Sequence, residues 1–303
     1  MEIVPFADEH LDAAAELLAA RHEGHRLEFP ELPAEIDYRA EIAALLASGA
    51  TGVFTDGAYV LGVPDSPERW GPNIWVLAAG HASEDAELLR DVWAEAAAGW
   101  FEEGVKAHYV LVPATDTALV DAWFRLGFGA QQAHGIMEIP EREWPPAVRE
   151  ATKDDIEALV EIGPLLSRHQ RAAPVFSSVE QTADDVRADV LDDFSLDGVA
   201  NLVYEADGRI VGDFFVCPLE LSDAHAGLAR PPGAAFIGFA ITDPQVRGSG
   251  AGVALTDASF AWARDRGYET MVVDWRVTNL LASRFWPRRG FRTSFLRLHR
   301  WIG

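Results

Sequence analysis

The sequence predicts a mixed α/β protein that uses one structural unit twice. Two observations support this prediction. Strand-like and helix-like runs alternate along the 303 residues, and segments of the second half repeat segments of the first at a constant offset. Mixed strand and helix order is typical of a sheet with helices on its faces. A chain of this length can form two domains, each with its own core.

The repeat is clearest near the end of each half. DTALVDAWFRLGF matches NLLASRFWPRRGF without a gap, so that Asp116 corresponds to Asn279 and Trp123 to Trp286. Upstream, each half has two β-rich runs around an Asp-Gly turn, which is the signal of a short hairpin. We place the domains at 1–140 and 146–303. The Pro-rich stretch 138–148 joins them, because prolines disfavour a continuous helix or a central strand.

Each unit reads as a strand, one or two helices, a hairpin, and then strand, helix, strand, helix and strand. The helices are recognised by apolar residues at helical spacing and by acidic starts. In the second unit the later elements are expected at 234–242 (strand), 250–267 (helix), 270–277 (strand), 279–290 (helix) and 291–302 (strand).

Composition argues against several functions. A formal net charge of −23 opposes binding to nucleic acid or to anionic membranes, and it favours cationic small molecules or basic peptides as partners. We find no apolar run of about 18 residues that would span a membrane, and the first residues do not resemble a secretory signal. Cys217 is the single cysteine, expected as a small apolar filler in a strand. We expect a cytoplasmic protein.

A glycine-rich junction follows the strand expected at 234–242. After a turn at Asp243-Pro244, the segment 247–252 (RGSGAG) opens a helix. N–H groups at a helix start have no partner within the helix, the helix dipole adds positive charge, and glycines let a phosphate approach the backbone. The junction is therefore an anion site or, alternatively, a tight turn with close helix packing. The glycine spacing fits neither a Rossmann fingerprint nor a P-loop.

Two motifs resemble the signatures of the GCN5-related N-acetyltransferases (GNAT). The first, Arg/Gln-x-x-Gly-x-Gly/Ala after a strand and a Pro turn, is matched by Arg247, Gly250 and Gly252. The second, Asn-x-x-Ala-x-x-aromatic before Gly-Phe, is matched by Asn279, Ala282, Phe285 and Gly290-Phe291. The resemblance covers residues 146–303 well and the first unit in outline.

The resemblance implies tandem GNAT-like domains, each with a mostly antiparallel mixed sheet flanked by helices. It implies transfer of an acetyl group from acetyl-CoA to a primary amine of a small molecule or a peptide N-terminus, without a metal. The strand end would bond the pantetheine arm and the glycine loop would bind the pyrophosphate. The implied cofactor-binding residues are Ala240, Ile241, Thr242, Arg247, Gly248, Ser249, Gly250, Ala251, Gly252, Val253, Asn279, Ala282, Phe285 and Trp286.

Asp274 is the candidate catalytic residue. It precedes Asn279 at the position where the ribosomal-protein N-terminal acetyltransferases have the glutamate assigned as base, and a solvated carboxylate or a pair with Arg276 is the alternative. The family often has a tyrosine that protonates the departing thiolate where this sequence has Trp286, and an indole cannot serve as that acid. A thiol is a tolerable leaving group without one.

The first unit departs from the motif. At the constant offset, Asp85 and Glu87 take the places of loop glycines and Leu111 takes the place of Asp274. Carboxylates at a helix start stabilise the helix but repel phosphate. We interpret this unit as a degenerate copy kept for structure or acceptor binding.

Several alternatives stay open. The Trp286 substitution allows a non-catalytic acyl-CoA-binding or sensing protein, and the tandem plan is also similar to mycothiol synthase. The oligomeric state is open, with a homodimer as one option. His169 is expected to be a solvated helix residue rather than a group that orients substrate. A basic cluster either steers the 3′-phosphate of CoA or serves the structure: Arg288, Arg289, Arg292, Arg297 and Arg300.

Overall fold

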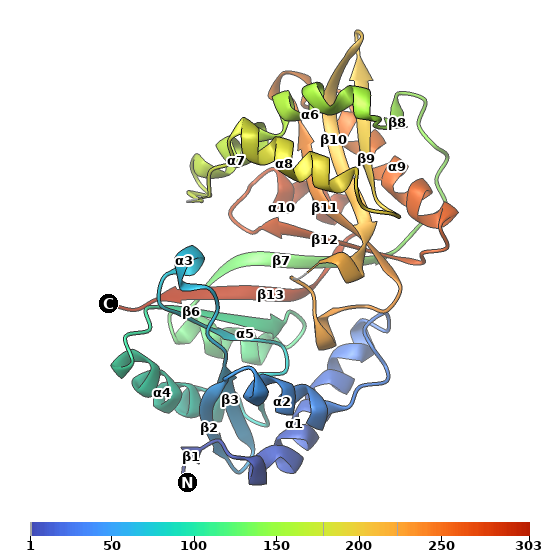
Figure 1. The fold of residues 1–303 in the computed structure, drawn as a ribbon. Helices are drawn as coiled ribbons and strands as arrows, with labels where there is room; N and C mark the ends of the chain where they lie inside the picture. Colours follow the sequence, from blue (N-terminus) through green and yellow to red (C-terminus); the bar gives the residue numbers. More distant parts are fainter. Residues whose placement is uncertain (1, 178, 223) are drawn as a thin grey trace. The chain divides into compact units, whose positions relative to one another are not determined.

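The computed structural model describes residues 2–177, 179–222 and 224–303, and their contacts divide the chain into two units (Figure 1). Unit 1 comprises Met1–His134, Ala226–Pro232 and Thr293–Gly303, and unit 2 comprises Gly135–His225 and Gly233–Arg292. In the part of the chain that the structure describes, no helix has both the length and the apolar character that a bilayer span requires.

Unit 1 contains two sheets. One has the order β1-β2-β3-β5 and is antiparallel, and the other has the order β4-β6-β13-β7, with β4 and β6 parallel and β6 and β13 antiparallel. Its elements are β1 (Val4–Pro5), η1 (Asp8–His10), α1 (Leu11–Glu28), α2 (Tyr38–Ala47), β2 (Thr51–Thr55), β3 (Ala58–Gly62), α3 (Pro67–Trp70), β4 (Asn73–Val76), β5 (His81–Ser83), α4 (Ala86–Glu102), β6 (Ala107–Pro113), α5 (Thr117–Arg125), the start of β7 (Gly129–Glu138), η4 (Gly227–Ala229) and β13 (Arg292–Trp301).

Unit 2 has the strand order β7-β12-β11-β10-β9-β8, in which β8 to β11 are antiparallel neighbours and β11 and β12 are parallel. Its elements after β7 are β8 (Val148–Glu150), η2 (Lys153–Asp155), α6 (Ile156–Ile162), α7 (Pro164–Arg171), α8 (Ala183–Asp193), β9 (Ala200–Ala206), β10 (Arg209–Pro218), η3 (Leu219–Leu221), β11 (Ala234–Thr242), η5 (Pro244–Val246), α9 (Ala251–Asp265), β12 (Thr270–Arg276) and α10 (Ala282–Arg288).

The two units repeat one plan, as the sequence predicts. The parallel pair of β4 and β6 corresponds to that of β11 and β12. The helices α5, α9 and α10 come after β6, β11 and β12, and α4 comes after β4 and the short strand β5. The residues at matching positions also act alike. Asp116 caps α5 by accepting a hydrogen bond of 2.9 Å from the Leu119 N–H, and Asn279 Oδ1 lies 3.2 Å from the Leu281 N–H before α10. The mixed α/β fold with a repeated unit is present.

The last strand of each copy lies outside the unit that precedes it. Thr293–Gly303 belongs to unit 1, where β13 pairs with β6, and the part of β7 from Gly135 onward belongs to unit 2. The Ile139 N–H donates to the Glu269 carbonyl at 2.8 Å within unit 2. The sequence-based boundaries at 1–140 and 146–303 treat each copy as one continuous segment, so the two divisions differ at these strands. A strand pattern does not say which of two equivalent sheets the strand joins.

Aromatic side chains dominate the core of unit 1. Trp93, Trp100 and Trp123 are buried, and the Trp123 ring meets Phe128 edge-on with centroids 5.0 Å apart. Such pairs contribute about 0.5–1.5 kcal/mol beyond their buried area. In unit 2, apolar residues of α6 and α8 pack on β9 and β10. Cys217 is buried on β10, as predicted, and burial raises the pKa of its thiol to about 12.

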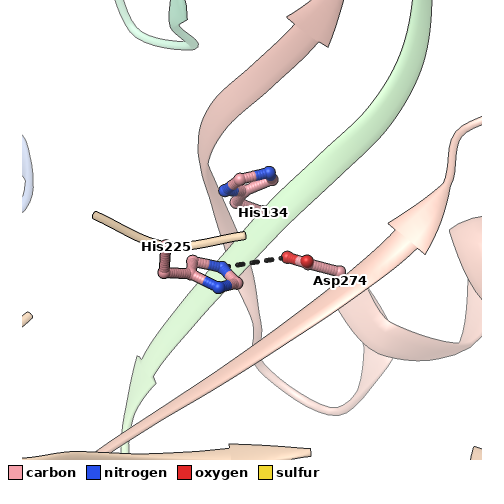
Figure 2. Close-up of side chains that lie close together, drawn as sticks. All are labelled: His134, His225 and Asp274. Carbon is pink, nitrogen blue, oxygen red and sulfur yellow. Dashed lines mark ion pairs between the residues drawn. The ribbon is translucent and has the colours of Figure 1, made fainter. Parts of the chain in front are cut away.

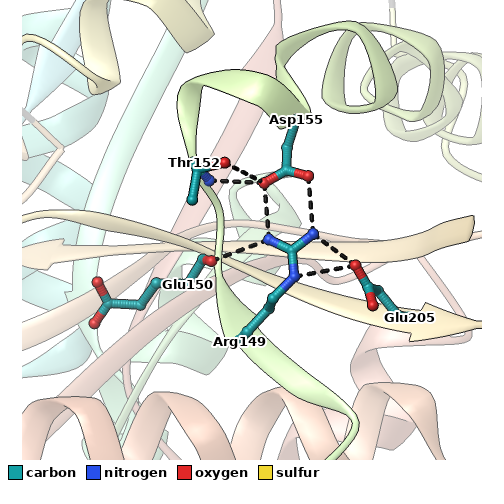
Figure 3. A network of polar contacts seen from close by, with 5 residues as sticks. All are labelled: Arg149, Glu150, Thr152, Asp155 and Glu205. Carbon is teal, nitrogen blue, oxygen red and sulfur yellow. Dashed lines mark hydrogen bonds and ion pairs between the residues drawn. The ribbon is translucent and has the colours of Figure 1, made fainter. Parts of the chain in front are cut away.

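Arg149 joins the first elements of unit 2 (Figure 3). Its guanidinium donates two parallel hydrogen bonds to Asp155, of 2.7 and 2.8 Å, and Nε donates to Glu205 on β9 at 3.0 Å. Asp155 also accepts from the Thr152 N–H at 2.7 Å, closing the capping box of η2. Arg149 holds the pKa of Asp155 well below its usual range. Bidentate pairs of this kind fix geometry as well as charge, so β8, η2 and β9 are held in register.

His108 on β6 makes the stability of unit 1 depend on pH. It is 1% exposed and lies edge-on to Trp93 and Trp100, with centroids 5.9 and 5.6 Å away, and burial lowers its pKa to about 4. The unfolded side chain binds a proton near pH 6.5, whereas the folded one does so only near pH 4. The stability is therefore full above pH ~6.5 and is lost as the pH falls toward ~4, by up to about 3 kcal/mol.

We predict that His108→Phe reduces this pH dependence, because phenylalanine fills the aromatic site without a titrating group. Urea unfolding at several pH values between about 4.5 and 7.5 measures the free energy of unfolding. Below pH ~6.5 the free energy of unfolding of the variant should fall less steeply with pH than that of the wild-type protein. The difference between the two slopes should correspond to at most about one bound proton. Equal slopes in both proteins contradict the prediction.

Candidate functional site

The glycine-rich loop opens α9 as the sequence predicts. Gly250 precedes the helix with φ 97° and Gly248 has φ 83°, a left-handed conformation that favours glycine. A Cβ added at either residue would meet no described atom within 4 Å, so the space in front of the loop is open. Since Gly250 has no side chain, it does not cap the helix.

Several backbone amides of this loop remain for an anion. The Ser249 N–H donates to the Val246 carbonyl at 3.1 Å, and the Ala254 N–H donates to the Gly250 carbonyl at 2.9 Å. The N–H groups at 251–253 precede the first bond within the helix and have no acceptor in it. Free amides of this kind, together with the helix dipole, are able to bind an anion. The Ser249 amide, expected to take part, is used within the turn.

The two parallel strands separate beside this loop. β11 pairs with β12 only from Ala234, opposite Thr270, to Ile237, opposite Val273. At Gly238 the register of β11 against β10 shifts, which marks a bulge. Beyond it, residues 239–242 pair with β10, and within the described part of the chain their other edge is not paired with β12. An open strand edge of this kind accepts an extended ligand as an added strand would be accepted.

Alternation along β11 decides which backbone groups face that edge. The Asp243 N–H donates to the Val211 carbonyl of β10 at 2.8 Å, so this pair is hydrogen-bonded. Bonded and non-bonded pairs alternate in antiparallel strands. The N–H and C=O of Thr242 and Ala240 therefore point to the open edge, whereas those of Ile241 point to β10.

Phe285 is placed at the loop and Trp286 is not. A Cβ at Gly252 would lie 3.4 Å from Cζ of Phe285 and 4.0 Å from Cγ2 of Thr242, so α10, the loop and the strand end meet here. Trp286 is 5% exposed and packs against Phe214 and Phe291, with ring centroids 5.9 and 5.5 Å away. Its indole belongs to the core of unit 2.

Asn279 is 7% exposed, and its side chain accepts hydrogen bonds from backbone N–H groups at the start of α10. Its Oδ1 accepts from the N–H groups of Leu281 at 3.2 Å and Ala282 at 3.3 Å. His169, on α7, places Nε2 3.3 Å from the same oxygen. The expectation of a solvated His169 is thus wrong: the ring is part-buried against Asn279. No local pattern marks this contact, because 110 positions separate the two residues.

Asp274 follows Val273, the last residue of β12 that pairs with β11. Its side chain is 13% exposed, and Oδ1 lies 3.2 Å from Nε2 of His225 (Figure 2). His134, also drawn in Figure 2, belongs to unit 1. His225 was not among the residues expected from sequence, which contains no motif around it.

Two arginines of the basic cluster form hydrogen bonds within unit 1. Arg297 donates to Gln131 at 2.8 Å, and Arg300 donates to the Leu126 carbonyl at 2.5 Å. Arg289, in unit 2, pairs with Asp257 on α9. These contacts favour the structural alternative for the three residues.

The corresponding helix start in unit 1 is occupied. The Asp85 side chain accepts from the N–H groups of Glu87 at 2.8 Å and Leu88 at 3.2 Å, and so caps α4. Glu87 forms ion pairs with Arg90 and Arg125. Two amides at the helix start that corresponds to that of α9 therefore have a carboxylate partner from the chain itself.

Side chains of unit 1 also donate hydrogen bonds to backbone carbonyls at 78–81, from the end of β4 to the start of β5. Arg21, from α1, donates to the carbonyls of Ala78 and His81, and the Tyr59 hydroxyl donates to the Ala79 carbonyl at 2.7 Å. Burial lowers the pKa of Arg21 to about 10. In unit 1, side chains are thus hydrogen-bonded to backbone carbonyls of the segment that corresponds to the open part of β11.

Comparison with known proteins adds the family. Residues 166–291 match the model of the acetyltransferase (GNAT) family. No curated protein matches the sequence.

Three solved structures share the fold. A GCN5-related N-acetyltransferase from Sphaerobacter thermophilus has 16% identity over 99% of this chain and 95% of its own, with a TM-score of 0.58. A tandem GNAT protein from the clavulanic acid biosynthesis pathway has 13% identity over 100% and 98%, with a TM-score of 0.51. A glucosamine N-acetyltransferase region of a fungal β-N-acetylglucosaminidase has 12% identity over 98% and 38%, with a TM-score of 0.54.

At such identities the likeness shows the fold, and the motifs locate the family domain. Residues 166–291 form a domain of the GNAT acetyltransferase family, and the chain has the fold of tandem GNAT proteins, as its motifs and internal repeat predict.

Proposed function

We propose that residues 146–303 transfer an acetyl group from acetyl-CoA to a primary amine of a small molecule or a peptide N-terminus, and that residues 1–140 are a degenerate copy. The observation that carries the proposal is the continuity, in unit 2, of an open strand edge at 239–242 with an uncapped helix start at α9. Acetyl-CoA has a pantetheine arm that matches the strand edge and a pyrophosphate that matches the helix start, so one donor molecule fits both parts.

The cofactor contacts follow from this geometry. Backbone groups of Ala240 and Thr242 would bond the pantetheine arm, and the amides at 250–253 would bind the pyrophosphate. Phe285 would pack beside the phosphates. The exposed Arg247 adds positive charge at a loop whose protein carries a formal net charge of −23. This local compensation is needed because a polyanion would otherwise be repelled.

The chemistry requires one proton acceptor. Asp274 takes a proton from the ammonium of the acceptor, and the freed lone pair attacks the thioester carbonyl carbon. The C–N bond forms and the C–S bond breaks; the nitrogen gives up its second proton, the departing sulfur takes up one, and the amide and the CoA thiol result. A positioned base contributes about 10²–10⁴-fold, and holding both reactants together contributes further.

An acyl-CoA-binding protein without turnover is the second candidate. The observation that favours it is the place of Trp286, which is buried in the core where the family often has a tyrosine. A thiol with a pKa near ~8.5 leaves without a donor, so the substitution is compatible with catalysis as well. A mycothiol-synthase-like activity is a substrate-level variant of the first proposal.

We predict that the full chain binds one acetyl-CoA, because the corresponding site in unit 1 is occupied by its own side chains. Calorimetry gives the stoichiometry. A thiol-release assay then tests a panel of amines that includes glucosamine, on which the similar fungal region acts by its name, and basic peptides. Binding without release on any amine favours the sensor. Two sites per chain would show that the first unit is not degenerate.

A second prediction concerns the anion site. Gly250→Glu should abolish acetyl-CoA binding, because it places a carboxylate and a Cβ at a residue with φ 97° in front of the amides. The matched control is Gly208→Glu, at a hairpin glycine of the same unit with φ 74° and open space around it. Calorimetry should show normal affinity for the control alone. Normal affinity of Gly250→Glu refutes the site.

The third prediction concerns the base. Asp274→Asn keeps the shape of the side chain but cannot take the proton, so kcat should fall by about 10²–10⁴-fold. The affinity for acetyl-CoA should stay normal, since the phosphates and the pantetheine are held by other residues. Steady-state kinetics over a range of pH and calorimetry measure the two effects. An unchanged kcat removes Asp274 as the base.

A further inference from the structure

A carboxyl group is buried in the sheet of unit 2 without a hydrogen bond to its Oδ1. It belongs to Asp213 on β10, which is 4% exposed, and among the described residues no donor reaches this oxygen. The residues directly opposite Asp213 are Val203 of β9 and Ile241 of β11, both buried and apolar. Burying such a group costs stability. Asp213 therefore has a role other than stabilising the sheet.

A second carboxyl group lies on the same face. α6 and α8 cover this face of β9 and β10 (Figure 1), and Asp193 is the last residue of α8. Oδ2 of Asp193 accepts a hydrogen bond of 3.2 Å from Nδ2 of Asn201 on β9. Burial, and then the charge of Asp193, raise the pKa of Asp213 well above its usual range, and burial raises the pKa of Asp193 to about 6. A nearby cation would favour the ionised form of both groups.

Aromatic side chains lie between Asp213 and the bulge of β11. Phe215 follows Asp213 by two residues on β10, so both side chains point to one face. The residues opposite Phe215 are Asn201 and Phe239. A Cβ at Gly238 would lie 3.3 Å from Cδ1 of Phe215, so this ring reaches the bulge. Gly238 is exposed and the two phenylalanines are half-buried. An alkyl chain that enters at the bulge therefore meets aromatic surface before Asp213.

We propose that Asp193 and Asp213 bind a second cationic group of the acceptor, which is then an aliphatic diamine or polyamine. The proposal rests on the proposed function, in which one amine reacts where β11 and β12 separate. The ammonium at the other end of the chain binds between the two carboxylates. Asp213 ionises when it binds, and its proton passes to solvent.

An ammonium group suits this site better than a metal ion does. Carboxylates and aromatic rings both attract an ammonium, whereas calcium and magnesium take six or more oxygen ligands. The sheet also sets the length of the chain. Asp213 lies one strand across and two residues along from Phe239, a separation of about 8 Å, which is the length of a diamine with about five methylene groups.

Steady-state kinetics with matched amines test the substrate class. 1,5-Diaminopentane should have a KM about 10- to 100-fold lower than that of pentylamine, because only the diamine brings a second charge to the carboxylates. Diamines with three to six methylene groups, and spermidine, complete the panel, each compared with the monoamine of equal length. Equal KM values within every pair would overturn the proposal.

Variants of the acids locate the effect. Asp213→Asn and Asp193→Asn should each raise the KM of the preferred diamine by about 10- to 100-fold. The KM of the monoamine and the affinity for acetyl-CoA should not change, since neither uses the carboxylates. Asp197→Asn is the matched control, because it removes one charge from an exposed residue in the turn after α8. An equal rise in this control indicates diffuse attraction by the acidic protein and contradicts a site.

A third substitution separates binding from folding. Asp213→Val continues the apolar row of Val203 and Ile241, so the free energy of unfolding in urea should stay equal or increase, whereas the KM of the diamine should rise. A variant that is less stable than the wild-type protein would show that Asp213 serves the fold, and the proposal would be wrong.

Calorimetry with CoA present distinguishes this proposal from the proposed function. If 1,5-diaminopentane binds, and Asp213→Asn weakens its binding, while no amine is acetylated, the cation site stands and acetyl transfer falls. If diamines and monoamines are acetylated equally well, acetyl transfer stands and the cation site falls.

Discussion

Backbone N–H and C=O groups at a helix start or an open strand edge need hydrogen-bond partners, and the two units meet that need in different ways. In unit 1 the partners are side chains: Asp85 caps α4, and Arg21 donates to the carbonyls of Ala78 and His81. In unit 2 the residue before α9 is Gly250, which has no side chain to cap the helix, and β11 continues past its pairing with β12. The groups left there are those for which we propose a ligand.

This difference explains how one plan can support two roles. A carboxylate at a helix start stabilises the helix by about 0.3–1 kcal/mol and excludes a phosphate by charge. A glycine at that place forgoes the capping and leaves the amides accessible. Unit 1 therefore has the more self-contained helix start, whereas the loop of unit 2 has more to gain from a bound anion. A ligand that binds only the folded state would return this stability.

Two of the residues in the proposed site are contacted by histidines from other parts of the chain. Asp274 is close to His225, and Asn279 accepts hydrogen bonds at the start of α10 while His169 lies 3.3 Å from its oxygen. In both cases a histidine from a separate segment contacts a residue that the motifs or their spacing single out.

The sequence by itself determined the repeated α/β plan, the family and the glycine loop, because these depend on local periodicity, turn residues and short spacings. Tertiary structure alone decided the rest. It placed the last strand of the chain, Thr293–Gly303, in unit 1, turned Trp286 into the core, and brought His169 to Asn279 and His225 to Asp274. Such contacts join distant positions, and the sequence near each partner carries no signal of the other.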